Sequence, residues 1–307
     1  MKRWGSRAAL AAVLVAGAAA TAPAASAHGG GGGKLVGSVT ENGAQTVIVY
    51  RANKPWKVER LQVVGLTAGD RISGLDVRPA TRTLYGNGQG AGTAQNYIVQ
   101  LNFDDRPAGF DGRAIFSPVG ARYATTGASF GYDFNPTVDR IRVISDADQN
   151  LRVNPDTGAA LVDGTIRYAA GDRNFGRDPS ATGAGYIPAP FGGMTTLYDI
   201  ETNQDVLTTQ TPANDGTLQT IGSLGVKVTN VVGFDIASGD HGRNVAYAAL
   251  QREGESRSGL YTIDLRSGRA YRAGHIGSSQ PVETLAILRP GKHGGWSHGN
   301  GHKHGRR

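Results

Sequence analysis

The chain has 307 residues, with 32 Lys and Arg against 25 Asp and Glu, which gives a formal net charge of +7. It contains no cysteine, so disulfide bonds, thiolate metal sites and thiol nucleophiles are excluded. Aromatic residues at 7% and hydrophobic residues at 39% allow a packed core, which argues against a chain that is disordered throughout.

The first 27 residues have the three parts of a secretory signal peptide. Basic residues come first, residues 8–20 form an uncharged apolar run, and residues 25–27 read Ala-Ser-Ala, a small-x-small cleavage signal. The apolar run is shorter than the roughly 20 residues that a membrane-spanning helix needs. We therefore expect Sec-type secretion with cleavage after Ala27, and no transmembrane segment.

Both ends of the mature chain lack any apolar periodicity. Residues 28–34 are a Gly-rich leader, and residues 289–307 are a tail of Gly, His and basic residues. Neither could bury enough apolar surface to offset the entropy of ordering, so both are predicted to be disordered. Residues 35–288 hold 23 basic and 25 acidic residues, a formal charge of −2. We therefore expect weak contact with anionic surfaces at the tail, no specific nucleic acid binding, and a monomer.

Residues 35–288 have the pattern of short β-strands separated by turns. Asn-Pro and Asp-Gly pairs mark several of the turns, and no segment after the signal peptide has a helical period with caps. The clearest predicted strands are Thr46–Tyr50, Leu61–Val64, Ile98–Leu101, Ile141–Ile144, Val245–Leu250 and Leu260–Leu265.

A Gly-x-Asp phrase between apolar residues recurs along this region, each time followed by another short strand. It begins at Gly74, Gly131 and Gly233, and weaker copies lie around Gly185 and in residues 283–287. Anchors at positions 76, 133, 185, 235 and 285 are 57, 52, 50 and 50 residues apart. A period near 50 with about four strands per unit is typical of propeller blades.

The two ends of the region complete the predicted architecture. Residues 35–64 hold strands without the repeated phrase, and residues 283–288 hold a single strand. Together they would make one blade that closes the ring between the N- and C-terminal strands. We therefore predict an all-β domain over residues 35–288, a propeller of five blades, with six blades or a β-sandwich as alternatives.

These phrases resemble DUF4394, a family of bacterial secreted proteins described only as a domain of unknown function. The resemblance covers about residues 44–288 and departs at 86–114, where a Gly-rich stretch and residues 104–107 replace a tight hairpin. It implies a secreted, propeller-like domain and brings no activity, ligand or catalytic residue. The residues that carry it are Gly74–Pro79, Phe130–Pro136, 138–158, Thr196–Tyr198 and Ser258–Gly268.

Asp76, Asp133 and Asp235 occupy the same place in three units, each between two apolar residues. One interpretation is a ring of carboxylates in a central channel that holds a cation such as Ca²⁺. The other is that each Asp accepts hydrogen bonds from turn amides of its own blade, and the repetition favours this structural role. The metal interpretation would suit an extracellular, lactonase- or hydrolase-like propeller enzyme, the alternative to a non-catalytic binding or structural module.

The tail suggests a third function, metal capture. Neutral imidazoles bind Zn²⁺ or Cu²⁺, and a flexible His-rich segment can wrap around one ion. The spacings of 5, 4 and 2 residues do not match a fixed structural site. The histidines are His293, His298, His302 and His304.

Three further motifs have simpler explanations. Residues 146–150 begin like a calcium loop, but Leu151 stands where an EF-hand needs Gly, which favours a polar turn. Residues 127–131 match G-x-S-x-G, yet a strand follows where a nucleophile elbow needs a helix. Residues 86–92 are rich in Gly without the Lys-Ser/Thr of a phosphate loop, so we predict a flexible loop.

Overall fold

The computed structural model describes residues 33–106, 109–187, 195–238 and 244–288. Strands joined by turns make up most of these residues, together with one turn of 3-10 helix, η2 (Ala213–Asp215). None of the helical residues among them forms a segment that is long and apolar enough to cross a membrane. The predicted signal peptide, most of the leader and the His-rich tail lie outside the described residues.

Five of the six clearest predicted strands lie wholly within observed strands, and Leu260–Leu265 continues past the end of its strand into a turn. The strands are β1 (Lys34–Glu41), β2 (Ala44–Arg51), β3 (Lys54–Val64), β4 (Arg71–Val77), β5 (Leu84–Gln89), β6 (Gln95–Arg106), β7 (Gly109–Ala124), β8 (Phe130–Asn135), β9 (Arg140–Ser145), β10 (Asn150–Val153), β11 (Ala160–Val162), β12 (Arg167–Tyr168), β13 (Ala181–Ile187), β14 (Thr196–Glu201), β15 (Val206–Gln210), β16 (Thr217–Ser223), β17 (Val228–Ser238), β18 (Asn244–Arg252), β19 (Ser258–Ile263), β20 (Ala270–His275) and β21 (Ala286–Leu288).

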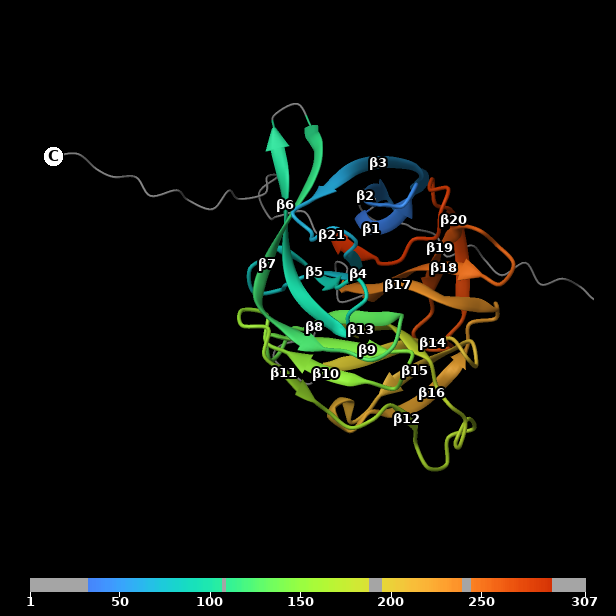
Figure 1. The fold of residues 1–307 in the computed structure, drawn as a ribbon. Helices are drawn as coiled ribbons and strands as arrows, with labels where there is room; N and C mark the ends of the chain where they lie inside the picture. The colour runs from blue at the N-terminus through green and yellow to red at the C-terminus, as the bar shows by residue number, and fades with distance from the viewer. Residues whose placement is uncertain (1–32, 107–108, 188–194, 239–243, 289–307) are drawn as a thin grey trace, which may run out of the picture. The chain divides into compact units, whose positions relative to one another are not determined.

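The strands form four sheets, in which chain neighbours pair antiparallel (Figure 1). Three sheets have the orders β11-β10-β9-β8, β12-β16-β15-β14-β13 and β17-β18-β19-β20. The fourth has eight strands in the order β21-β1-β2-β3-β7-β6-β5-β4. Its two halves meet where β3 pairs parallel with β7, from Gln62 opposite Arg113 to Val64 opposite Ile115.

Five inner strands contact one another in a closed cycle: β4 with β8, β8 with β13, β13 with β17, β17 with β21, and β21 with β4. The cycle closes because β21, at the end of the domain, pairs with β1, with Lys34 opposite Leu288. The Ser38 amide also donates to Thr284 Oγ1 at 3.0 Å, across 246 residues of sequence. The pairing between the chain ends that the sequence predicted is therefore present.

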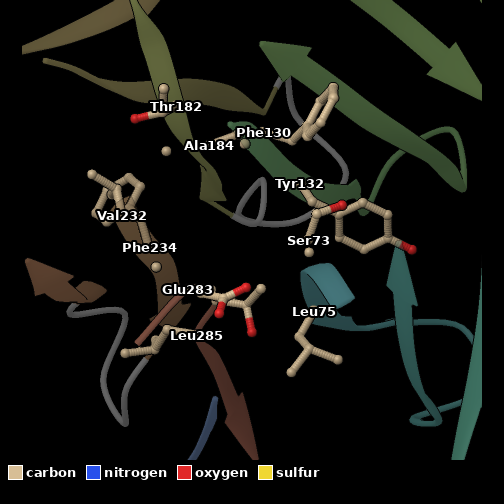
Figure 2. Close-up of a pocket in the computed structure, with 15 residues that line it drawn as sticks. Ser73, Leu75, Phe130, Tyr132, Thr182, Ala184, Val232, Phe234, Glu283 and Leu285 are labelled. Carbon is tan, nitrogen blue, oxygen red and sulfur yellow. The ribbon is translucent and has the colours of Figure 1, made fainter. Parts of the chain in front are cut away.

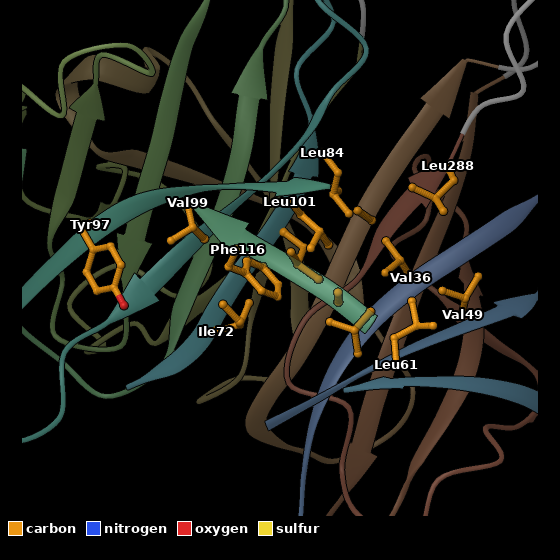
Figure 3. Packing of buried hydrophobic residues seen from close by; sticks show 14 residues of the cluster. Val36, Val49, Leu61, Ile72, Leu84, Tyr97, Val99, Leu101, Phe116 and Leu288 are labelled. Atoms are coloured by element: carbon orange, nitrogen blue, oxygen red, sulfur yellow. The ribbon is translucent and has the colours of Figure 1, made fainter. Parts of the chain in front are cut away.

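A buried cluster fills the space between the two halves of the eight-stranded sheet (Figure 3). Val36, Val47, Val49 and Leu61 lie on β1 to β3, and the other members, such as Ile72, come from β4 to β7 and β21. Full burial of each aliphatic side chain contributes about 1.5–3 kcal/mol. Because residues 47–50 of β2 are buried without alternation, this strand has both faces covered.

The prediction of a flexible loop at residues 86–92 is wrong for its first half. Gly86 and Gly88 lie within β5. A Cβ added at Gly88 would lie 2.6 Å from Cζ of Tyr97 on the paired strand β6. The Tyr97 ring therefore covers this glycine, an aromatic–glycine pairing that stabilises strands.

Candidate functional site

Three of the inner strands carry the Gly-x-Asp phrase at matching places. Asp76 on β4, Asp133 on β8 and Asp235 on β17 are buried, with 7%, 4% and 6% of their surface exposed. Their apolar neighbours belong to the cores between the sheets. Since successive side chains of a strand point to opposite faces, packing of the apolar neighbours turns each aspartate toward the middle of the five strands.

The glycine two residues before each aspartate lets the next inner strand approach closely. A Cβ at Gly74 would lie 2.4 Å from Cβ of Tyr132, and a Cβ at Gly233 would lie 2.5 Å from the carbonyl carbon of Thr284. Real side chains do not tolerate such distances, so these positions exclude any residue larger than glycine. The glycine and the aspartate thus act together: one admits the neighbouring strand and the other binds its backbone.

Each aspartate accepts a hydrogen bond from a backbone amide of the next inner strand. The structural interpretation of the sequence placed the donors in turns of the same blade, and that assignment of the donors is wrong. The aspartates link one sheet to the next, across more than 50 residues of sequence in each case. The three bonds are Phe134 N–H to Asp76 Oδ2 at 2.8 Å, Tyr186 N–H to Asp133 Oδ2 at 2.7 Å, and Ile287 N–H to Asp235 Oδ2 at 2.6 Å.

The other two inner strands lack an aspartate at this place. The bond of Ile287 sets Ala286 as the equivalent residue on β21, one position after the anchor that the sequence spacing suggested. On β4, which follows β21 in the cycle, Val77 N–H donates to Oδ1 of its own neighbour Asp76 at 2.6 Å. Asp76 therefore also supplies the acceptor that an aspartate at position 286 would have provided.

The three carboxyl groups lie close together. One oxygen from each lies within 4.8 Å of the others. Burial, followed by the charge of Asp235, holds the pKa of Asp76 well above its usual range, and burial with the charges of Asp76 and Asp235 does the same for Asp133. Three charged carboxylates at this separation need either a bound proton or a cation between them.

A small cavity lies on the side from which the inner strands begin, and it is lined by the residues that precede the aspartates in the sequence and not by the aspartates themselves (Figure 2). Strands β4, β8, β13 and β17 and the segment directly before β21 each contribute the three residues that precede the aspartate position, such as Ser73 to Leu75 before Asp76. The cavity volume is about 10 Å³, which is room for about one water or a single ion. Two polar atoms that line it, Thr182 Oγ1 and Glu283 Oε2, are buried without a hydrogen-bond partner among the described residues.

A second buried polar network, which the sequence interpretation missed, joins two neighbouring sheets around Arg142 of β9. Arg142 is 2% exposed and forms an ion pair with Asp163 at 2.7 Å. The only sequence signal was a single Arg inside an apolar strand. Its guanidinium donates to Asn150 Oδ1 at 2.7 Å, Asp163 Oδ2 at 2.7 Å, Asn214 Oδ1 at 2.8 Å and Tyr186 Oη at 3.3 Å.

Asp199 on β14 lies close to this network but has no hydrogen-bond partner among the described residues at either carboxyl oxygen. It is 0% exposed. Burial raises the pKa of Asp199 well above its usual range, although the nearby Arg142 charge lowers it somewhat. The neutral form of its carboxyl group is therefore favoured in the folded protein over a wider pH range than in the unfolded chain.

We expect Asp199→Asn to raise the free energy of unfolding at about pH 8 by about 1 kcal/mol, because the amide does not have to hold a proton that the unfolded carboxyl group releases. The folded pKa lies above the unfolded one, so wild-type stability falls as pH rises from the unfolded toward the folded pKa. The neutral amide does not have this loss. Urea unfolding at about pH 4 and pH 8 measures it; a gain that is equal at both pH values would contradict the assignment.

The remaining sequence motifs have structural roles. Asp146 lies in the turn between β9 and β10 and accepts from the amides of Ala128 and Ser129 at 2.8 and 3.2 Å. Asn150 Oδ1, the third oxygen of the calcium-loop pattern, accepts a hydrogen bond from Arg142 at 2.7 Å. The G-x-S-x-G glycine at 131 lies within strand β8. The four tail histidines lie outside the described residues. Among the residues that the structure describes, the Asp trio is the one group of His, Asp or Glu side chains able to offer three metal ligands.

Known proteins give this chain a family but no activity. No curated protein matches it. Similar solved structures include a glutaminyl cyclase of Myxococcus xanthus (14% identity, 75% of this chain and 87% of that chain, TM-score 0.43). Another is a putative 6-phosphogluconolactonase from Bacteroides uniformis (12% identity, 81% of this chain and 83% of that chain, TM-score 0.36). A third is a PQQ-bound aldose sugar dehydrogenase from Streptomyces coelicolor (15% identity, 83% of this chain and 85% of that chain, TM-score 0.38). These similarities are too weak to carry a function to this chain. The family model described as "Domain of unknown function (DUF4394)" matches residues 46–286, and because it spans most of the sequence, the chain belongs to the DUF4394 family.

Proposed function

We propose that this DUF4394 protein is a secreted, non-catalytic binding or structural module whose inner strands are held together by a divalent cation such as Ca²⁺. The cation would bind Asp76, Asp133 and Asp235. The observation that carries the proposal is the meeting of three buried carboxyl groups, with one oxygen of each within 4.8 Å of the others. Carboxylate oxygens are the ligands that Ca²⁺ prefers, and a cation would neutralise the charge that burial penalises.

The surroundings of the trio favour a cation in addition to protons. Thr182 Oγ1 lines the nearby cavity and is a buried oxygen without a hydrogen-bond partner among the described residues, whereas Glu283 Oε2, on the same cavity, forms an ion pair with Arg71 at 4.0 Å. Thr182 is 1% exposed. Oxygen atoms of this kind complete the coordination of Ca²⁺, directly or through water.

The proposal includes a five-bladed propeller as the architecture. The parallel pairing of β3 with β7 joins two groups of four strands that otherwise resemble the other sheets. Counting these groups separately gives five units, and each supplies three residues to the lining of the cavity. Secretion rests on the signal-peptide pattern of residues 1–27.

Cavity size is the reason to prefer a non-catalytic role over a lactonase- or hydrolase-like enzyme. A substrate would have to reach the carboxyl groups, and the cavity beside them has a volume of only about 10 Å³. Small-molecule sites usually have about 300–1,000 Å³. A single ion fits this space, and an organic ring does not.

We expect Ca²⁺ at about 100 times its Kd to stabilise the protein at about pH 7.5 by about 2.7 kcal/mol, raising Tm by roughly 5–11 °C. Without Ca²⁺, stability should fall as pH rises above the unfolded carboxyl pKa, because the folded pKa values of Asp76 and Asp133 are raised. With Ca²⁺ the trend should reverse, since the ion binds ionised carboxylates. Thermal unfolding with Ca²⁺ or with EDTA measures both effects.

Asp133→Asn keeps an oxygen acceptor for the Tyr186 amide but removes the charge, so it should abolish the response to Ca²⁺. Asp199→Asn is the matched control, a buried carboxyl outside the trio, and should keep the response.

The metal content should be measured in a full-length variant with the four tail histidines replaced by alanine. An unchanged Tm with Ca²⁺, together with no stoichiometric metal, would refute the cation and leave a protonated trio. Loss of Zn²⁺ or Cu²⁺ binding in the same variant would assign metal capture to the tail.

A further inference from the structure

A second pocket, far larger than the cavity beside the aspartates, is lined by the first three strands. Its volume is about 380 Å³, within the usual range for small-molecule sites. Four of its eight lining residues are basic and one is acidic. We call it the hairpin pocket; its residues are Lys34, Val49, Tyr50, Arg51, Lys54, Lys57, Val58 and Glu59.

Strand register gathers the basic residues. Lys34 of β1 lies opposite Arg51 of β2, and Arg51 lies opposite Lys54 of β3, so three cations form a row across three strands. Next to this row the register of β2 and β3 shifts: Tyr50 pairs with Val58, which leaves three residues of β3 opposite a single step of β2. Such a bulge redirects side chains, and it brings Lys57 to the same pocket.

This arrangement opposes stability in the absence of a ligand. Like charges directly opposite one another on paired strands are destabilising. No described residue forms an ion pair with Arg51, Lys54 or Lys57, and all three are exposed. The one acidic residue of the pocket, Glu59, lies opposite Val49 and outside the row. The charges of Arg51, Lys54 and Lys57 are therefore available to a ligand.

We propose that the hairpin pocket binds a tetrahedral oxyanion, the phosphate or sulfate group of a small molecule. Arg51 can hold two oxygens of such a group with its planar guanidinium, and the lysines supply point charges around it. The volume exceeds what one phosphate fills, so the pocket also takes part of the molecule that carries the anion. Glu59 provides an acceptor for a hydroxyl group of that carrier.

The net charge of the domain conceals this site. Residues 35–288 sum to −2, and the sequence interpretation therefore assigned anionic contact to the tail. Three basic residues within seven positions, from Arg51 to Lys57, are present in the sequence. Their convergence with Lys34 depends on the pairing of β1 with β2 and on the bulge, which a charge count does not include.

The experiment is calorimetric titration of the full-length protein with inorganic phosphate and, separately, inorganic sulfate, at constant ionic strength and with EDTA present. We expect one site per chain and roughly tenfold weaker binding in each of the variants Arg51→Gln and Lys57→Gln. The loss of one charge-assisted hydrogen bond to the anion weakens the affinity by about this factor. Arg266→Gln is the matched control, an exposed arginine in the turn after β19. It should leave the affinity within about twofold.

A stability measurement provides a second test that does not depend on affinity alone. At low salt without phosphate, Arg51→Gln should have a Tm equal to or above that of the wild type, because it removes one of the opposed charges. Phosphate should then raise the Tm of the wild type and not that of the variant. EDTA keeps the result independent of the proposed axial cation.

Selective binding of phosphate would assign a phosphorylated ligand, selective binding of sulfate a sulfated one, and equal binding would support the shared oxyanion chemistry. Equal losses in Arg51→Gln and Arg266→Gln would overturn the proposal. Binding of single-stranded DNA without any binding of the inorganic anions would also overturn it, since it would indicate a nucleic acid surface instead of a pocket.

Discussion

Arg142→Ala is expected to lower the free energy of unfolding by about 4 kcal/mol, the typical cost of removing one partner from a buried ion pair. The guanidinium of Arg142 binds side chains on both sides of the contact between two sheets. Its loss would leave Asp163, whose side chain is 6% exposed, with Arg152 as the remaining ion-pair partner among the described residues. The amides of Asn150 and Asn214 would lose their donor as well.

Urea unfolding at neutral pH measures this effect, with Arg140→Ala as the control. Arg140 begins the same strand but is exposed, and its guanidinium donates only to a backbone carbonyl among the described residues, Asp139 O at 2.9 Å. Its replacement should cost no more than about 0.5 kcal/mol. Arg142→Lys keeps the charge without the planar fork and should fall between the two. Equal effects of Arg142→Ala and Arg140→Ala would show that the network does not stabilise the contact.

Gly74→Ala is expected to destabilise the protein by about 3 kcal/mol, at the upper end of the usual cost of overpacking. The added methyl group would lie 2.4 Å from Cβ of Tyr132, a backbone-bound atom that cannot rotate away. Strands β4 and β8 would have to separate, which would lengthen the bond from Phe134 N–H to Asp76. Because this bond positions a member of the trio, the response to Ca²⁺ should weaken in the same variant.

Gly33→Ala is the control, since its added Cβ would have one neighbour, Ile287 Cγ2, at 4.0 Å. We expect a change within about 0.5 kcal/mol there. Thermal unfolding should place Gly74→Ala roughly 6–12 °C below the wild type. A Gly74→Ala protein as stable as the control would mean that the inner strands can move apart freely, and the close approach would then have no energetic role.

The repeated phrase predicted the position of the trio because its spacing is a property of each unit. Glycine, aspartate and apolar neighbours occur within four residues, and the closed cycle of strands brings the copies together. The donors to the aspartates could not be predicted in the same way. Asp76 accepts a hydrogen bond from an amide 58 residues later. The amides of a nearby turn are donors of the same kind, so a short-range sequence pattern cannot distinguish the two. Only the relative placement of two sheets decides between them.

The parts that were missed also depend on contacts between units. Arg142 looks like an ordinary exposed strand residue until Asn214, 72 residues away, is placed beside it. The parallel pairing of β3 with β7 has no turn or motif to indicate it, because it joins the outer strands of two units. The Gly-rich sequence around Gly88 predicted a loop, because the ring of Tyr97 that covers this glycine lies on the next strand and is not visible in the local pattern.

The pairing of β21 with β1 has a consequence for the order of events during synthesis. The last strand has only three residues, and its partner was made more than 240 residues earlier, as the bond between Ser38 and Thr284 shows. Contacts of such long range make folding slow, because loop-closure entropy must be overcome before they form. The eight-stranded sheet therefore cannot be completed before residues 286–288 have been made, and β1 keeps an unpaired edge until they are in place.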